Sequence, residues 1–583
     1  MSLTFKDSKK WGMISNQLTA SLVGSDGNVL WMCMPRFDSD PIIAYMLDED
    51  NGGKFSIMPK EEYTSEQKYA APNILSTVFR TAKGTCTVTD FLPPGKTMLV
   101  RDVRSDIELE LQMQPTFSFG NSGINYSENE GFGVFDNASG DDRVVTKIEM
   151  NVAERNGNVY TLSPGNGHVA MAYYVSREVF NFPAEREMFQ AISKILEPTI
   201  EYWNSKIKLD IDGIKSSGVP ELDRVFNASI QVVLGLVYSP SGGIIAAPTT
   251  SLPEDPGGVR NWDYRFVWVR DCSIMASSLC DVEFVVEGRR ALEFLFGLVD
   301  FSGKPFYNLY KVNGSRIYGE KYMNNLSGFM GSKPIKAGNR ASNQIQLDIE
   351  GEFMDAVYHY FGKTKDTEFI KAHAKAIEYI GDWLSDNWQL TDSSIWEKTD
   401  DKEYTYSKVM MWVALDRAGK LLSVVGEKDK WVGARALIKS WVMSNCVKNG
   451  HFVVEPNSQR VDATPLLFPL YGFMDVNDPV FVNTLSLIEK TLVKNDFVFR
   501  YVSDSLGKSL HAFSLCSSWL SSVYSKMGNK KRAKDILINL ARLSGPLGLI
   551  GEDIDVGEMT FTGNFPQGFS HAGFIQAFLE LQS

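Results

Sequence analysis

The sequence predicts two domains, an N-terminal antiparallel β-sandwich and a C-terminal closed ring of α-helices. The chain has 583 residues, which is more than one hydrophobic core usually serves. Its first part consists of short β-rich runs separated by Gly, Asn, Asp and Pro, a pattern typical of antiparallel sheets. From about residue 219 onward, apolar residues recur at helical spacing instead.

The β-sandwich is expected to occupy residues 1–183. Its predicted strands lie in the runs 27–34, 54–59, 76–93, 98–117, 144–152 and 158–164. Residues 184 to 209 then place charges between apolar residues at helical spacing. We therefore expect a helical linker over residues 184–215.

Residues 216–583 are expected to form the helical domain. The predicted helices are 222–239, 268–282, 345–361, 368–387, 406–425, 430–446, 479–493, 511–527, 531–544 and 570–582. No fixed repeat supports a solenoid, so a closed double ring of helices is the better interpretation. The loops at one end of such a ring would carry the function.

Composition narrows the class of function. A net charge of −12 and the lack of a Lys/Arg cluster argue against nucleic acid as a partner and favour a neutral substrate. No stretch has the length and apolarity of a signal peptide or a membrane span, so we expect a cytoplasmic protein that does not bind membranes. The six cysteines are scattered without a CxxC or Cys/His cluster, which predicts buried free thiols and neither a metal nor another cofactor.

Three loops hold candidate functional residues. In "NWDYRFVWVRD", Arg270 and Asp271 follow an aromatic run and could grip vicinal hydroxyls, or they could form an ion pair that caps the next helix. In "SSIWEKTDD", Glu397 follows Trp396, and packing against the indole would favour its protonated form as a general acid. Alternatively, Glu397 is a surface charge.

The third loop, "GLIGEDIDVGE", presents Glu552 and Asp553 after an apolar run. An ionised carboxylate here could act as a general base on water, and paired carboxylates from separate loops are what glycosidic cleavage requires. Calcium binding is the alternative, but the loop lacks the ligand spacing of an EF-hand.

Taken together, these motifs resemble glycoside hydrolase family 15, the glucoamylase, glucodextranase and trehalase group. The resemblance runs from "GMISNQLTASLVGSDGNVLWMCMPRFDSDP" through "AAPTTSLPEDPGGVRNWDYRFVWVRD" and "IWEKTDDKEYTYSKVMMWVALDRA" to "GNFPQGFSHAGF", in the family's order. It implies a β-sandwich joined by a helical linker to an (α/α)6 barrel, and an inverting exo-acting hydrolase.

The resemblance also implies residue roles. Glu397 matches the general acid and Glu552 the general base. Arg270 and Asp271 match the pair that holds the non-reducing glucose, with Trp268 and Trp396 lining the pocket. Lys398 stands at the leaving-sugar subsite. His511 replaces acidic and small residues before a helix, where it could contact substrate or be a structural residue.

The substrate is the open part of the prediction. Trehalase-like members carry an arginine soon after the acid, whereas Lys398, Thr399 and Asp400 follow Glu397 here. We therefore expect a glucoamylase-like α-glucosidase acting on neutral gluco-oligosaccharides, as a monomer or homo-oligomer, with α,α-trehalase as the alternative. A sugar phosphorylase, which needs no base, and a non-catalytic sugar-binding protein are two further hypotheses.

Overall fold

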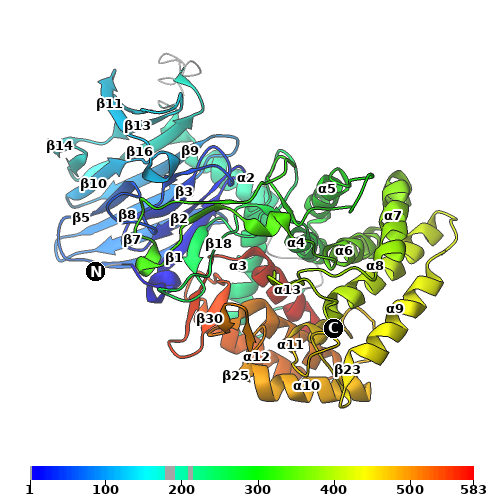
Figure 1. The fold of residues 1–583 in the computed structure, drawn as a ribbon. Helices are drawn as coiled ribbons and strands as arrows, with labels where there is room; N and C mark the ends of the chain where they lie inside the picture. Colours follow the sequence, from blue (N-terminus) through cyan, green and yellow to red (C-terminus); the bar gives the residue numbers. More distant parts are fainter. Residues whose placement is uncertain (1–2, 178–188, 190, 208–213) are drawn as a thin grey trace.

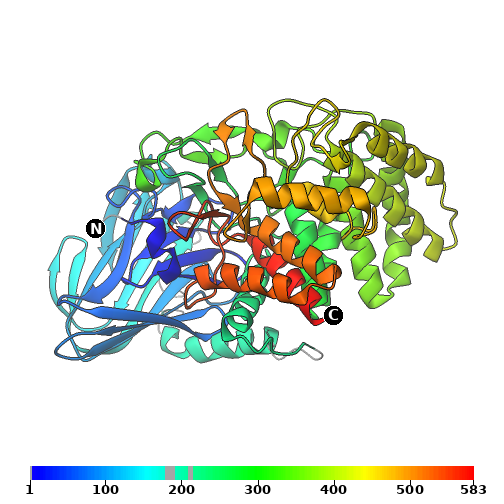
Figure 2. The same ribbon diagram turned by 90° about the horizontal axis from the view of Figure 1, so that it is seen from below.

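The computed structural model describes residues 3–177, 189, 191–207 and 214–583. Figures 1 and 2 show a β domain packed beside a larger helical domain. This arrangement confirms the predicted fold class, an N-terminal antiparallel β domain followed by an (α/α)6 barrel. The expected linker, 184–215, falls partly outside the described residues, and helix α2 (Leu196–Lys206) lies within it.

The β domain is built from three antiparallel sheets in the part of the chain that the structure describes. The sheets have the strand orders β1-β2-β3-β4, β14-β15-β10-β5 and β11-β12-β13-β16-β9-β8-β7-β6. The strands are β1 (Trp11–Ser15), β2 (Ala20–Gly24), β3 (Val29–Cys33), β4 (Pro41–Ile43), β5 (Lys54–Pro59), β6 (Thr64–Ala71), β7 (Ile74–Arg80), β8 (Thr85–Phe91), β9 (Met98–Ser105), β10 (Leu109–Gln114), β11 (Ile124–Asn129), β12 (Phe132–Asn137), β13 (Arg143–Glu149), β14 (Val152–Asn156), β15 (Val159–Leu162) and β16 (Gly165–Tyr174).

Side-chain alternation explains why these runs form strands. In β10, Leu109, Leu111 and Met113 are buried, while the polar residues between them are more exposed. Leu111 lies opposite Ile57 of β5, so the register places apolar side chains from both strands in one core. Strands β1, β2 and β3 are buried along their whole length because β1 also contacts α3 of the helical domain.

The helical domain closes into two concentric layers. Helix α4 packs on α6, α6 on α8, α11 on α13 and α13 on α4, and the short 3-10 segment η7 (Thr464–Leu467) completes the inner ring beside α11. The helices are α3 (Pro220–Gly235), α4 (Val269–Asp281), α5 (Val285–Phe296), α6 (Ile349–Thr364), α7 (Thr367–Asn387), α8 (Thr405–Val424), α9 (Val432–Asn445), α10 (Pro479–Leu492), α11 (Ser514–Lys526), α12 (Lys530–Leu543) and α13 (Gly568–Gln582).

Short strands occupy the loops of the barrel. They are β17 (Thr250–Pro253), β18 (Asn261–Asp263), β19 (Val267–Trp268), β20 (Leu309–Tyr310), β21 (Glu320–Tyr322), β22 (Lys336–Gly338), β23 (Val447–Lys448), β24 (His451–Phe452), β25 (Val493–Lys494), β26 (Phe497–Val498), β27 (Ser503–Asp504), β28 (Gly507–Lys508), β29 (Ala512–Phe513), β30 (Asp553–Asp555) and β31 (Thr560–Thr562). Several of them pair the loops that precede inner helices, as β29 does with β30.

The β domain supports one of these loops directly. Arg265, buried in the loop before α4, forms an ion pair with Asp263 at 2.7 Å and reaches the backbone carbonyl of Ser39. The indole nitrogen of Trp31 donates to the carbonyl of Pro248 at 2.7 Å. The β domain therefore fixes the segment from which Trp268, Arg270 and Asp271 project.

Two further predictions concern buried thiols and membranes. All six cysteines are buried and unpaired, which confirms the sequence-based expectation. Among the residues that the structure describes, no helix has both the length and the apolar character needed to cross a bilayer.

Candidate active site

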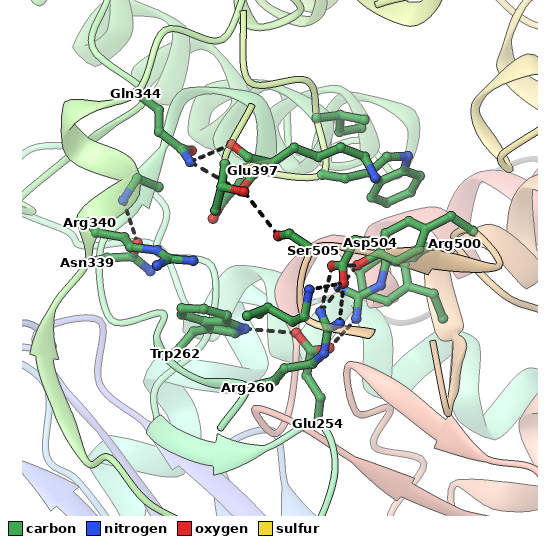
Figure 3. A pocket seen from close by; sticks show the side chains of 18 of the residues that line it. Glu254, Arg260, Trp262, Asn339, Arg340, Gln344, Glu397, Arg500, Asp504 and Ser505 are labelled. Carbon is green, nitrogen blue, oxygen red and sulfur yellow. Dashed lines mark hydrogen bonds and ion pairs between the residues drawn. The ribbon is translucent and has the colours of Figure 1, made fainter. Parts of the chain in front are cut away.

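A pocket opens at the end of the barrel where the inner helices begin (Figure 3). The space that it spans is about 810 Å³ when the open solvent at its mouth is included. Its lining residues come from the loops before several inner helices and are Glu254, Arg260, Trp262, Tyr264, Arg270, Asn339, Arg340, Ala341, Gln344, Ile395, Trp396, Glu397, Lys398, Thr399, Arg500, Tyr501, Asp504, Ser505, Leu506, Phe513, Trp519 and Phe569. Helix N-termini at this end place partial positive charge toward the pocket.

Glu397 projects into the pocket from the loop before α8. Its backbone has a φ of 53°, and its carbonyl accepts a hydrogen bond from Nε2 of Gln344 at 3.1 Å. Its carboxylate accepts from Nε1 of Trp268 at 3.1 Å and lies 3.7 Å from the Arg270 guanidinium. The side chain is 26% exposed, so the carboxyl group is held from behind and still open to the pocket.

Glu552 lies behind Tyr264, which lines the pocket. The hydroxyl of Tyr264 donates to Oε1 of Glu552 at 2.7 Å, and the backbone N–H of Asn564 donates to Oε2 at 3.0 Å. Burial, with the neighbouring carboxylate of Glu254, raises the pKa of Glu552. The Tyr264 and Trp268 rings pack edge to face with centroids 5.3 Å apart, so one aromatic pair connects Glu552 to Glu397.

Arg270 and Asp271 occupy the first turn of α4, and both are buried. Nε of Arg270 lies 3.3 Å from Oδ2 of Asp271, and the guanidinium also contacts Gln346 at 3.2 Å and Asp348 at 3.7 Å. Burial raises the pKa of Asp271 to about 6, although the positive charge of Arg270 acts in the opposite direction. The structure therefore brings Arg270 and Asp271 together with Glu397 at one side of the pocket.

The two predicted tryptophans have different surroundings. Trp396 lines the pocket, its indole nitrogen donates to Asp462 at 2.8 Å, and its ring packs near Tyr501 and Phe513. Trp268 is 2% exposed, and it is the indole that contacts the Glu397 carboxylate. The sequence pattern predicted Trp396 for that contact.

Lys398 and His511 line two different cavities. Lys398 lines the pocket, and its Nζ lies 4.3 Å from the centre of the Tyr501 ring, where burial lowers its pKa. His511 lines a neighbouring cavity instead, with Nε2 3.6 Å from Asp255. That cavity shares Glu254, Arg260 and Arg500 with the pocket.

Sequence reasoning missed part of the pocket. Glu254, Arg260 and Tyr264 stand in the segment 246–271, yet nothing in their residue types separates them from charges that cap a helix. Arg500 and Tyr501 lie in a stretch without any recognised motif. Only the folded chain shows that all of them meet at one pocket.

Three buried carboxylates lie beside one another at the back of the pocket and could, by geometry, hold a metal ion. Glu254, Glu552 and Asp553 each offer an oxygen, and these oxygens lie within 4.8 Å of one another. A guanidinium already supplies positive charge there, because Arg500 contacts Glu254 and lies 3.7 Å from Asp553.

Comparisons with known proteins agree with this geometry. The model of a family described as glycosyl hydrolases family 15 matches residues 222–579, and the model of a trehalase-like N-terminal domain matches residues 6–141. The chain belongs to glycosyl hydrolase family 15. Within this family it is 41% identical to Trehalase 1 of Sulfolobus acidocaldarius over 581 residues, which covers 98% of this chain and 99% of the relative.

Two other relatives and one solved structure are also similar to this chain. Trehalase 2 of the same organism is 35% identical, with 98% of this chain and 99% of the relative covered. A trehalase of Thermoplasma volcanium is 30% identical, with 98% of this chain and 93% of the relative covered. A bacterial glucoamylase complexed with acarbose matches the fold with a TM-score of 0.73 at 12% identity, covering 98% of this chain and 94% of that one. The chain is therefore a glycoside hydrolase with the architecture of that glucoamylase.

Proposed function

We propose that this glycoside hydrolase is an α,α-trehalase that cleaves trehalose with inversion at one anomeric carbon. The observation that carries the proposal is the likeness to relatives named trehalase over both domains, at 41% identity for Trehalase 1 of Sulfolobus acidocaldarius. This likeness favours trehalase over the glucoamylase-like activity expected from the sequence. That expectation depended on the missing arginine after Glu397.

The surroundings of Lys398 weaken the case for a glucoamylase-like substrate. Arg340 and Lys398 line the pocket from different loops, so cations reach it without an arginine in the acid loop. Ser505, in the hairpin of β27 and β28, accepts a hydrogen bond from Thr399 at 3.0 Å (Figure 3). A pocket that is bounded in this way suits a short substrate better than a long glucan.

The glucose that remains attached until water attacks would sit against Arg270 and Asp271. Nε of Arg270 and Oδ2 of Asp271 are buried and face each other at 3.3 Å, and neither has another hydrogen-bond partner among the described residues. A charged donor and acceptor held at this long separation can both bond to a sugar hydroxyl placed beside them. This supports the binding role proposed for the pair.

The chemistry would use the two glutamates. Glu397 gives its proton to the glycosidic oxygen as that bond to the anomeric carbon breaks. Water attacks the same carbon from the opposite face, and Glu552 takes a proton from the water as the new bond forms. The leaving glucose keeps its α configuration, and the attacked glucose is released as the β anomer.

The test is a side-by-side assay of glucose release from trehalose, maltose, maltotriose and isomaltose, with proton NMR following the anomers. We expect trehalose to be cleaved at least about tenfold faster than the other sugars in kcat/KM, with equal initial amounts of α- and β-glucose. Faster cleavage of maltose or maltotriose would overturn the substrate. Two α-glucose molecules from each trehalose would overturn the inversion.

The same assay distinguishes hydrolysis from phosphorolysis and from sugar binding without cleavage. Glu552→Gln should reduce hydrolysis by roughly a thousandfold, since no base would then activate water. An unchanged rate that requires inorganic phosphate would point to phosphorolysis instead. Binding of trehalose by the intact wild-type protein without any cleavage would indicate a sugar-binding protein.

A further inference from the structure

Arg500 is a buried guanidinium surrounded by acids. Its Nη2 contacts Glu254 and lies 3.7 Å from Oδ1 of Asp553. The Arg500 side chain is 12% exposed and rests over the Phe513 ring at 4.8 Å. Figure 3 shows Arg500 and Glu254 on the side of the pocket away from Glu397 and Gln344.

The charges around Arg500 do not balance. Glu254, Glu552 and Asp553 bring three carboxylates within 4.8 Å of one another, and Arg500 contacts two of them. Two further cations of the described residues lie near the cluster, and each has a carboxylate of its own: Arg260 pairs with Asp504 at 2.6 Å, and Lys336, which also interacts with Glu254, lies 3.6 Å from Glu320. Three buried carboxylates close together repel one another, and this repulsion favours retention of a proton within the cluster.

Several of the described groups that face this cluster donate hydrogen bonds to it. Nε1 of Trp262 donates to Glu254 at 2.9 Å, while Tyr264 and the backbone N–H of Asn564 donate to Glu552. Glu397 faces the cluster from the far side of Tyr264 and interacts electrostatically with that phenol. Glu254 and Glu552 therefore each have donors that stabilise a negative charge.

Asp553 differs from its two neighbours. Neither of its carboxylate oxygens has a hydrogen-bond partner among the described residues, and the residue is fully buried. Burial raises the pKa of Asp553, and repulsion from Glu254 and Glu552 acts in the same direction. The shared proton is accordingly best held by Asp553, since a buried carboxylate without donors is the costliest one to ionise.

We propose that Arg500, Glu254 and Asp553 form a positioning network for Glu552, in which Asp553 holds the proton and Arg500 supplies the charge that keeps Glu552 ionised. This inference rests on the proposed role of Glu552 as the base. Arg500 also lines the pocket, but the role assigned to it and to Asp553 is exerted through Glu552, whose raised pKa the positive charge of Arg500 opposes. Glu254 moderates the effect because it draws Arg500 toward itself and repels Glu552.

The network predicts opposite effects of two neutral replacements on the acid limb of the kcat/KM profile, which reports the base in the free enzyme. Arg500→Gln removes a cation, so the limb moves to higher pH by about one unit. Glu254→Gln removes an anion, so the limb moves to lower pH by roughly half a unit or more. Arg500→Lys keeps the positive charge, so the acid limb of this variant should lie close to its wild-type pH.

A third replacement locates the proton. If Asp553 is neutral, Asp553→Asn exchanges one neutral group for another and leaves the limb within about 0.3 unit and kcat/KM within about threefold. A shift of about one unit toward low pH would mean that Asp553 is ionised and would overturn its assigned role.

The control is Arg532→Gln. Arg532 lies on α12, and its guanidinium also pairs with a carboxylate, that of Asp496, at 2.6 Å. This replacement removes a paired guanidinium that does not line the pocket. Its profile should match the wild type. Shifts of the same sign in Arg500→Gln and Glu254→Gln, or a loss of kcat in both without any shift, would show a merely structural role. Should Arg500→Gln fail to fold, Glu254→Gln decides, because a limb that does not move to lower pH in that variant overturns the network.

The outcome of this test can be told apart from the outcome of the test of the proposed function. The limb belongs to the free enzyme, so it can be measured on whichever α-glucoside the wild type cleaves. Failure on trehalose with opposite shifts on maltose would overturn the substrate and support the network. Trehalose cleavage without opposite shifts would support the substrate and overturn the network.

Discussion

Trp268 donates its indole N–H to Oε1 of Glu397 across 3.1 Å, and Arg270 approaches the same oxygen at 3.7 Å. An oxygen that accepts from a donor and faces a cation does not carry the carboxyl proton. Under the proposed mechanism, the proton that Glu397 transfers is therefore carried by Oε2. In that mechanism Trp268 sets which oxygen of the acid serves the glycosidic bond.

Trp268→Phe should lower kcat on trehalose by roughly tenfold to a hundredfold, since the carboxyl group loses the donor that orients it. KM should change little because Trp268 is buried behind the acid. Steady-state kinetics measure both constants. A rise in KM at constant kcat would show instead that Trp268 serves substrate binding.

Glu397→Gln should lower kcat on trehalose by about a thousandfold, because the glycosidic oxygen then leaves without a proton. α-Glucosyl fluoride offers a direct check, since fluoride departs without protonation. Its hydrolysis by Glu397→Gln should stay within about tenfold of the wild-type rate. Equal losses on both substrates would contradict the assignment of Glu397 as the acid.

The two-domain fold was predictable because hydrophobic periodicity differs so clearly between its halves. The predicted run 479–493 became α10, and the runs at 76–93 became β7 and β8. Helix α5 was missed, since its apolar residues are interrupted by Glu287, Arg289 and Arg290. The inner element η7 was missed because prolines at 465 and 469 prevent a regular helix.

The site was predictable where residues stand in ordered motifs and not where they meet only in three dimensions. Of the predicted residues, Arg270, Trp396, Glu397 and Lys398 line the pocket, whereas Trp268, Asp271, His511 and Glu552 do not, and the roles of all eight stay predictions. No sequence pattern could show that Trp268, distant by 129 positions, would be the indole that contacts Glu397. His511 lines a different cavity, where its Nε2 lies 3.6 Å from Asp255, and nothing in its sequence position indicates this.

The hairpin is anchored by Asp504. This carboxylate accepts from two nitrogens of Arg260, at 2.9 and 2.6 Å, and from the hydroxyl of Tyr501 at 2.8 Å. Asp504→Asn should loosen the hairpin and raise KM for trehalose by roughly tenfold with a smaller change in kcat, since the leaving sugar loses a wall.

The matched control is Lys508→Gln, in the same hairpin but exposed. Its kinetic constants should equal those of the wild type. A second readout is the ratio of maltotriose to trehalose cleavage, which should rise in Asp504→Asn if the hairpin limits substrate length. An unchanged KM together with an unchanged ratio would remove the hairpin from the leaving-sugar site.

Glu352, in the first turn of α6, gives a prediction about stability. The residue is 3% exposed, and Tyr406 and Tyr471 donate hydrogen bonds to it, the latter at 2.5 Å. Burial raises its pKa from 4.5 to about 8, even though both phenols favour the ionised form. Folding therefore retains a proton that the unfolded chain releases between these two pH values.

The sign of the pH dependence follows from this. Because the folded state binds more protons in this window, the free energy of unfolding falls as pH rises from about 4.5 to about 8. The glutamine side chain in Glu352→Gln is neutral at every pH, so this variant lacks the decline in the free energy of unfolding. Relative to the wild type, its free energy of unfolding should rise by at most about 1.4 kcal/mol per pH unit.

Urea denaturation at several pH values across that window measures the difference. Glu489→Gln is the matched control, since Glu489 also accepts from a tyrosine, Tyr524, but is only half-buried on α10. The dependence of its free energy of unfolding on pH should be closer to that of the wild type than the dependence for Glu352→Gln is. Parallel curves for Glu352→Gln and the wild type would mean that Glu352 is ionised in the folded protein. The two phenols would then outweigh the cost of burying its charge.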